Sequence, residues 1–200
     1  MSTTAEFYFD VGSPASYLAW TQLPKICQET GGTLVYKPML LGGVYQATGN
    51  ASPATIPAKG AYTSTDYARH ARRYGVPYQN NPHFPIITLA LMRAATGVQM
   101  RLPERFQDFL GTVFKALWID ALNLNEPQLV AKTLMEAGFD VEQILALTND
   151  PEVKSLLRAT TDEAVSRGVF GAPTTFVGEH MFFGQDRLEW VRDTLQGKPL

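Results

Sequence analysis

The stretch EFYFDVGSPASYLAW, residues 6–20, decides the fold. Its first part, Glu6 to Val11, alternates aromatic residues with polar or small ones and stops at Gly12, which predicts a strand with at least one buried face. Pro14 then opens a helical pattern, because a proline suits the first helical position, whose N–H has no partner within the helix. Ser13 is therefore predicted at the N-cap, in a strand-to-helix turn.

A second strand follows the predicted helix, which runs from Pro14 to about Gln28. Residues 33–41 (TLVYKPMLL) favour a strand, although Pro38 restricts it to an edge, a bulge or an early end. Strand, helix and strand within about 40 residues are typical of a βαβ unit with a right-handed crossover.

The middle and the end of the chain have different periodicities. From about Lys59 to Gly168 the helical period dominates, and apolar residues between 106 and 121 recur three and four positions apart. Residues 174–177 and 180–183 then predict a hairpin, and a closing helix is expected from Asp186 to about Gln196.

The order βαβ, helical block, ββα predicts an α/β protein with a thioredoxin-like fold, in which a helical block interrupts a four-stranded sheet. We expect residues 1–57 and 169–200 to form one discontinuous thioredoxin-like domain. Residues 58–168 are expected to form an inserted all-helical domain.

Composition and charge argue against several function classes. The net charge is −2, and the basic residues are scattered except for Arg69, Arg72 and Arg73, so nucleic acid is not an expected partner. The N-terminus lacks a basic region followed by an apolar stretch, and no window approaches the roughly 18 apolar residues of a membrane span. We therefore expect a cytoplasmic protein without a membrane partner.

Cys27 is the only cysteine, which excludes an intramolecular disulfide, a Cys-x-x-Cys redox pair and a zinc site built on thiolates. The three histidines, His70, His83 and His180, lie in separate segments without ligand spacing, so no metal is expected.

Ser13 has three possible roles. It can be a plain N-cap, or a hydrolase nucleophile, which the absence of a G-x-S-x-G motif disfavours. It can also donate a hydrogen bond to an anion at the helix N-terminus, where the partial positive charge and free N–H groups favour a thiolate or carboxylate. Thioredoxin-like folds keep their reactive cysteine at this place, so any thiol here must come from a ligand.

Two C-terminal motifs allow a structural and a functional interpretation. Pro173 either starts a strand or forms a cis peptide bond with Ala172 that faces the reactive turn, ahead of an edge strand. A cis bond would leave the backbone of Ala172 free to pair with an extended peptide such as glutathione. Asp186 either caps the closing helix or, with Gln185 and the nearby N–H groups, holds a γ-glutamyl end, and both roles can coexist.

The ordered set of motifs resembles a known family. The stretches FYFDVGSPASYLA (residues 7–19) and GVFGAPTTFVGEHMFFGQDRLEWV (residues 168–191), with LLGGVYQATGN and RYGVPYQNNPHFP between them, are similar to the 2-hydroxychromene-2-carboxylate isomerase family. This family is a DsbA-like branch of the thioredoxin superfamily that includes the kappa-class glutathione transferases. The resemblance covers nearly the whole chain and is weakest over residues 98–165.

The resemblance implies a glutathione site. Ser13 would be the catalytic serine that stabilises the glutathione thiolate, and Ala172, before a cis Pro173, would pair with the cysteinyl backbone. The γ-glutamyl end would be held by Gly184, Gln185 and Asp186.

The resemblance also implies a second-substrate pocket. Asn50 and Lys59 would flank this pocket or the glycyl end, although a turn residue and a solvated lysine are the structural alternatives. Tyr78 and Phe84 suit a flat aromatic substrate. Resembling sequences often have Asn at the place of Ile87 and an acidic residue or glycine near Ala121-Leu122, so a more apolar pocket is expected here.

The implied activity is a glutathione-dependent cis–trans isomerisation. The substrate would be 2-hydroxychromene-2-carboxylate or a similar aromatic compound, the product a trans-o-hydroxybenzylidenepyruvate, and glutathione a regenerated cofactor. One alternative is a kappa-class transferase or peroxidase, which consumes glutathione at the same site. Another is a non-catalytic peptide-binding module, whose function would tolerate Ser13→Ala. A homodimer is expected from the resemblance.

Overall fold

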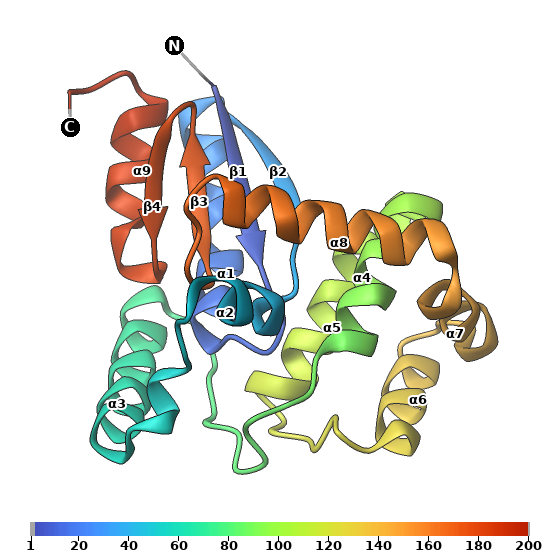
Figure 1. Cartoon of the computed structure of the whole chain (residues 1–200). Coiled ribbons are helices and arrows are strands. Elements are labelled where there is room, and N and C mark those ends of the chain that lie inside the picture. The colour runs from blue at the N-terminus through green and yellow to red at the C-terminus, as the bar shows by residue number, and fades with distance from the viewer. Residues whose placement is uncertain (1–2, 200) are drawn as a thin grey trace.

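The computed structural model describes residues 3–199, and within them four strands form one mixed sheet in the order β2-β1-β3-β4 (Figure 1). β1 (Thr4–Phe9) pairs in parallel with β2 (Thr33–Pro38) and antiparallel with β3 (Thr174–Val177). β3 pairs antiparallel with β4 (His180–Phe183). The predicted βαβ unit and the predicted hairpin therefore join in one sheet.

The position of β3 differs from the sequence expectation. Ala172-Pro173 was expected ahead of an edge strand, and this is wrong, because β3 lies between β1 and β4 and all four of its residues are buried. The hairpin partner β4 takes the outer edge instead. Pro38 is the last residue of β2, the strand at the opposite edge of the sheet. Its missing N–H does not interrupt the hydrogen bonds between β2 and β1.

Helices lie on both faces of the sheet: α1 (Pro14–Thr30) and α9 (Leu188–Leu195) on one face, and α2 (Leu41–Thr48) and α8 (Pro151–Ser166) on the other. Figure 1 shows α8 crossing in front of the sheet with α1 behind it. Successive side chains of a strand point to opposite faces. Phe7 and Phe9 accordingly join the core on the α1 side, whereas Tyr8 joins the core under α2 and α8.

The middle of the chain is helical, as predicted, with five helices between β2 and α8 besides α2: α3 (Pro57–Tyr74), α4 (Leu89–Arg101), α5 (Phe106–Trp118), α6 (Pro127–Glu136) and α7 (Val141–Asn149). Short 3-10 turns span Pro53–Thr55, Pro103–Arg105 and Gln185–Arg187. The core continues from the sheet into this block, because the Phe9 and Phe114 ring centroids lie 6.4 Å apart. The division into two domains stays a prediction.

Helix α2 was not expected. The strand predicted over residues 33–41 ends at Pro38, and a helix begins at Leu41 although Gly42 and Gly43 have low helical propensity. Tertiary contacts outweigh that propensity, since Val44 is fully buried in the core under α8. Within residues 3–199, no helix is both long and apolar enough to cross a membrane.

Candidate functional site

The reactive turn, residues 10–13, connects β1 to α1. Ser13 has the extended backbone of an N-cap (φ −95°), and its Oγ accepts the Ser16 N–H at 3.2 Å, which confirms the predicted cap. The same hydroxyl donates to the carbonyl oxygen of Ala172 at 2.9 Å. Ser13 therefore lies at the N-terminus of a 17-residue helix and in direct contact with the C-terminal part of the chain.

A cis peptide bond joins Ala172 to Pro173, as the sequence predicts. The register of the sheet explains why this bond faces the reactive turn. β1 and β3 run antiparallel with Tyr8 opposite Thr174, so the end of β1 lies beside the start of β3. The hydroxyl of Ser13 and the backbone of Ala172, 159 residues apart, consequently meet at one edge of the sheet.

The turn at residues 184–186 is fixed to the cis proline. The Gly184 N–H donates to the Pro173 carbonyl at 2.9 Å, and the Tyr74 hydroxyl donates to the Gln185 carbonyl at 2.5 Å. Gln185 is buried, whereas the side chain of Asp186 is 42% exposed. The structure therefore brings the predicted γ-glutamyl residues next to Ala172-Pro173, with one carboxylate open to solvent. No pattern in the sequence indicated that Tyr74 anchors this turn.

The expected helix cap at Asp186 is wrong. The closing helix α9 begins at Leu188, after the 3-10 turn, and neither segment has a side-chain cap hydrogen bond. The Asp186 carboxylate instead pairs with the Arg187 guanidinium at 2.8 Å. Gly184 has φ +94°, and a Cβ at this position would collide with the Asp186 carboxylate. Glycine is thus required for the conformation that presents Asp186.

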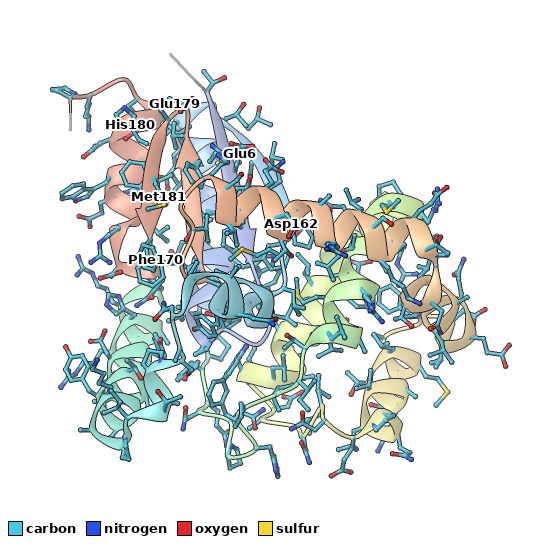
Figure 2. The ribbon with its side chains drawn as sticks, viewed as in Figure 1. Glu6, Asp162, Phe170, Glu179, His180 and Met181 are labelled. Atoms are coloured by element: carbon cyan, nitrogen blue, oxygen red, sulfur yellow. The ribbon has the colours of Figure 1, made fainter. Side chains whose placement is uncertain are left out.

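Asn50 follows α2 and is exposed. Its side-chain amide donates to the Phe170 carbonyl at 2.8 Å, and its Oδ1 accepts the Ala51 N–H at 2.8 Å. Figure 2 shows Phe170 beside the lower ends of β3 and β4. Asn50 therefore ties the loop after α2 to the segment that leads into the cis peptide. Lys59 lies exposed in the first turn of α3.

An aromatic cluster of Tyr78, Phe84 and Trp118 lies next to the reactive turn. The rings of Tyr78 and Trp118 stack with centroids 6.4 Å apart, and Phe84, which is 36% exposed, lies 6.3 Å from Trp118. The Trp118 indole N–H donates to the Val11 carbonyl at 2.8 Å, so the cluster is bonded to the turn. Burial raises the pKa of Tyr78, which keeps its phenol neutral. The sequence marked Trp118 only as a core residue of a helix.

The two departures from the resembling sequences differ in setting. Ile87 is 79% exposed, and its N–H donates to Oδ1 of Asn125 at 2.9 Å. Ala121 has φ +53°, a conformation that favours glycine, while Leu122 packs against the core. A glycine at the place of Ala121 would therefore relieve backbone strain, whatever its effect on a substrate.

The chain supplies no reactive thiol at this site. Cys27 lies buried near the C-terminal end of α1, and burial raises the pKa of its thiol to about 11. Within residues 3–199, no group of three or more His, Cys, Asp and Glu side chains lies close enough together to hold a metal ion. The site thus consists of a hydroxyl, a helix N-terminus, a cis peptide and an exposed carboxylate.

Comparison with known proteins agrees with this arrangement. A family model described as a DSBA-like thioredoxin domain matches residues 4–196. The chain belongs to this family. Curated DSBA-like relatives include 2-hydroxychromene-2-carboxylate isomerase from Sphingobium xenophagum, 30% identical over 98% of this chain and 99% of that protein. Human glutathione S-transferase kappa 1 is also 30% identical, over 98% of this chain and 92% of its own.

A solved structure of 2-hydroxychromene-2-carboxylate isomerase superimposes on this DSBA-like chain with a TM-score of 0.82 and 26% identity, over 96% of this chain and 94% of the other. The predicted fold, a thioredoxin-like sheet with inserted helices, is confirmed. The family resemblance of the sequence is confirmed as well, because the relatives carry the two expected names, isomerase and kappa-class transferase.

Proposed function

We propose that the protein is a glutathione-dependent cis–trans isomerase that acts on 2-hydroxychromene-2-carboxylate or a similar aromatic compound. One observation carries the proposal: the Ser13 hydroxyl, at the N-terminus of α1, lies 2.9 Å from the carbonyl that precedes cis-Pro173. A hydroxyl donor, a helix N-terminus and the backbone of Ala172, which precedes the paired residues of β3, form at one point a site for a peptide that carries a thiolate.

The residues present fit glutathione. Ala172 can pair with the cysteinyl backbone, as a strand edge pairs with an added strand. The half-exposed Asp186 carboxylate can bind the γ-glutamyl ammonium, and the adjacent Arg187 guanidinium can bind its carboxylate. The turn is held at a fixed distance from Ala172 because Gly184 bonds to Pro173.

Ser13 has to change its hydrogen bond when the ligand arrives. In the structure its proton is donated to the Ala172 carbonyl. A backbone N–H from a bound peptide can replace the hydroxyl at that carbonyl, and the hydroxyl can then turn to donate to a thiolate. The helix N-terminus favours the same negative charge, so both features lower the pKa of a thiol placed there.

When bound, glutathione supplies a thiolate that adds reversibly to a conjugated carbon of the substrate, so that a double bond becomes a single bond, rotates and is restored on elimination. The residues of the chain position the substrate beside this thiolate. Tyr78 and Phe84 offer an aromatic surface near the reactive turn, and the buried Trp118 behind them is fixed to the turn by its hydrogen bond to Val11. An aromatic substrate stacked there would lie next to the activated thiolate.

The fate of glutathione tests the proposal. The purified protein is incubated with 2-hydroxychromene-2-carboxylate and glutathione at one hundredth of the substrate concentration, and the products are followed by NMR. An isomerase brings the whole substrate pool to its equilibrium mixture of isomers and leaves glutathione unchanged. Accumulation of a thioether adduct equal to the added glutathione would contradict isomerisation.

A kappa-class transferase or peroxidase is the second candidate, because the human kappa-class relative is as similar to this chain as the isomerase is. Consumption of glutathione with an aromatic halide or a hydroperoxide, at a rate above that of the isomerase assay, would favour this candidate. No turnover in either assay, together with peptide binding that Ser13→Ala leaves unchanged, would instead indicate a non-catalytic peptide-binding module.

A further inference from the structure

Asp10 is a buried acid at the end of β1, three residues before Ser13, and it is 1% exposed. Its carboxylate has three hydrogen-bond partners. Oδ1 accepts the Gly12 N–H at 2.9 Å, and Oδ2 accepts the Leu41 N–H at 2.9 Å and the Thr88 hydroxyl at 3.0 Å. One carboxylate therefore contacts three segments that are far apart in the sequence.

Each of these segments carries part of the candidate site. Gly12 belongs to the reactive turn, and Leu41 is the first residue of α2, whose following loop carries Asn50. Thr88 precedes α4 and ends the loop that holds Tyr78 and Phe84. A Cβ on Gly12 would lie only 2.6 Å from the Thr88 methyl group, so the turn and this loop are also packed closely together.

The main chain of Asp10 completes the contact with the turn, because its carbonyl accepts the Ser13 N–H at 3.0 Å. We propose that Asp10 is the positioning residue of the reactive turn. It holds the Ser13 hydroxyl and the N-terminus of α1 in register with α2 and with the aromatic cluster. This inference rests on the proposed function, since it concerns the activation of a thiol at Ser13.

Asp10 can keep these contacts in both protonation states. Burial raises its pKa, and hydrogen bonds from Leu41, Gly12 and Thr88 oppose that rise. The Thr88 hydroxyl can donate to the carboxylate or accept from the carboxylic acid, whereas the two backbone N–H groups can only donate. Asparagine at position 10 would therefore place its NH2 group against one of those N–H groups and lose that hydrogen bond.

The test uses Asp10→Asn with the milder pair Thr88→Val and Thr88→Ser. Valine keeps the methyl contact with Gly12 and the charge of Asp10 but removes the hydroxyl, and serine restores the hydroxyl. Glu163→Gln is the matched control, because Glu163 accepts hydrogen bonds from Tyr8 and Lys37 away from the turn. The pKa of bound glutathione is measured from thiolate absorbance near 240 nm, and its Kd by calorimetry.

We expect the thiol pKa of bound glutathione to rise by at least one unit in Asp10→Asn and by a smaller amount in Thr88→Val, with Kd changed less than threefold. Thr88→Ser and Glu163→Gln should keep the wild-type thiol pKa, even if their melting temperatures fall. Loss of a negative charge alone would lower the thiol pKa, so a rise reports misplacement of the turn.

Three outcomes would contradict the positioning role of Asp10, and one of them would also contradict the proposed function. In the first, the wild type lowers the thiol pKa of glutathione relative to free glutathione, while Asp10→Asn gives the same pKa as the wild type or a lower one. This result overturns the positioning role of Asp10 and leaves the proposed function standing. If Asp10→Asn does not fold, the positioning role is overturned when glutathione bound to Thr88→Val has the same thiol pKa as glutathione bound to the wild type. A wild type that leaves the thiol pKa of glutathione unchanged overturns the proposed function and this inference together.

Discussion

Ser13 takes part, through its hydroxyl oxygen, in two hydrogen bonds at the centre of the candidate site. Its Oγ accepts one hydrogen bond within α1 and donates another to Ala172, and the residue is only 6% exposed. The cap uses a lone pair of the Ser13 oxygen, whereas donation uses its proton, which can turn from the Ala172 carbonyl to a bound thiolate while the cap is kept. The role of Ser13 as a cap and its role as a donor are therefore compatible.

Cys27 is a thiol that lies away from the reactive turn, in an environment that does not favour its thiolate. It therefore serves as a control for the claim that a thiol beside Ser13 is activated. Burial raises its pKa to about 11, and it is 4% exposed. We expect the native protein at pH 8 to resist iodoacetamide while small thiols in the same solution are alkylated within minutes. The unfolded protein should react fully, as seen by mass spectrometry. Rapid alkylation of the native protein would contradict this assignment.

Gly184 is the residue whose backbone presents Asp186. Its φ of +94° and ψ of 164° lie in a region that only glycine adopts easily, at a cost of about 1–3 kcal/mol for other residues. We expect Gly184→Ala to lower the free energy of unfolding by about that amount and to weaken glutathione binding at least tenfold, measured by calorimetry.

Gly138→Ala is the matched control for Gly184→Ala. Gly138 also has a positive φ, +76°, but a Cβ there would meet nothing within 4 Å, and it lies after α6. This variant should lose stability without losing glutathione affinity. Equal affinity in both variants would remove the γ-glutamyl role from the 184–186 turn.

At the scale of single residues, local signals were predictable and long-range contacts were not. The cap at Ser13 follows from a polar residue before a helical proline, whereas the proline before a strand left the cis bond at Pro173 as one of two alternatives, and the family resemblance favoured it. The bond from Ser13 to Ala172 depends on the register between β1 and β3, which no local pattern encodes. Of the two roles predicted for Asp186, the cap is wrong because the carboxylate pairs with Arg187, and the γ-glutamyl role stays a prediction.

At the scale of elements, α8 is joined to the sheet by an ionic network. Glu163 on α8 accepts hydrogen bonds from Tyr8 at 2.7 Å and from Lys37 at 3.2 Å, and Arg167 pairs with Glu6 at 2.8 Å. Figure 2 shows Glu6, a residue of β1, near the C-terminal end of α8. This network fixes the helix over the face that holds Tyr8.

The pH dependence of stability follows from Glu163. Burial opposes its ionisation, but the hydrogen bonds from Tyr8 and Lys37 outweigh burial and lower its pKa below the usual 4.5. A lowered pKa stabilises the folded state above pH 4.5, and this contribution is lost as the pH falls through the folded-state pKa. We expect Glu163→Gln to be less stable than the wild type at pH 7 and to approach it at pH 3, in thermal melts. A constant difference would contradict the linkage.

Helix α2 shows why one element escaped prediction. Its sequence, LGGVYQAT, contains two glycines and is only eight residues long, so neither propensity nor periodicity favours a helix. The helix exists because Val44 is buried under α8 and because Asp10 accepts the Leu41 N–H at its first turn. Both contacts are tertiary, and the site depends on them, since α2 leads to Asn50.

At the scale of the whole molecule, α5 joins the inserted helices to the reactive turn. Trp118 is 1% exposed, and its indole N–H donates to the Val11 carbonyl at 2.8 Å. Because the core continues from Phe9 to Phe114, the sheet and this helix should unfold together. The order of elements along the chain made the fold predictable, whereas this continuity was not visible in the sequence.

Trp118→Phe tests that connection. The variant leaves the buried Val11 carbonyl without its donor, which costs about 1–3 kcal/mol, and it also leaves a small cavity. We expect a lower midpoint of urea denaturation in a single transition and a higher KM for an aromatic substrate. Trp190→Phe, at a position that is 58% exposed, should match the wild type in both measurements. Two separate unfolding transitions would contradict a shared core.

The central claim is that Ser13 and the N-terminus of α1 stabilise a glutathione thiolate. The most direct measurement is a pH titration of thiolate absorbance near 240 nm for glutathione bound to the wild type and to Ser13→Ala, with Ser166→Ala as a control on an exposed helix end. We predict a thiol pKa at least one unit below that of free glutathione in the wild type and in Ser166→Ala, and a return toward the free value in Ser13→Ala. A bound thiol whose pKa is the same in wild type and Ser13→Ala would contradict the account.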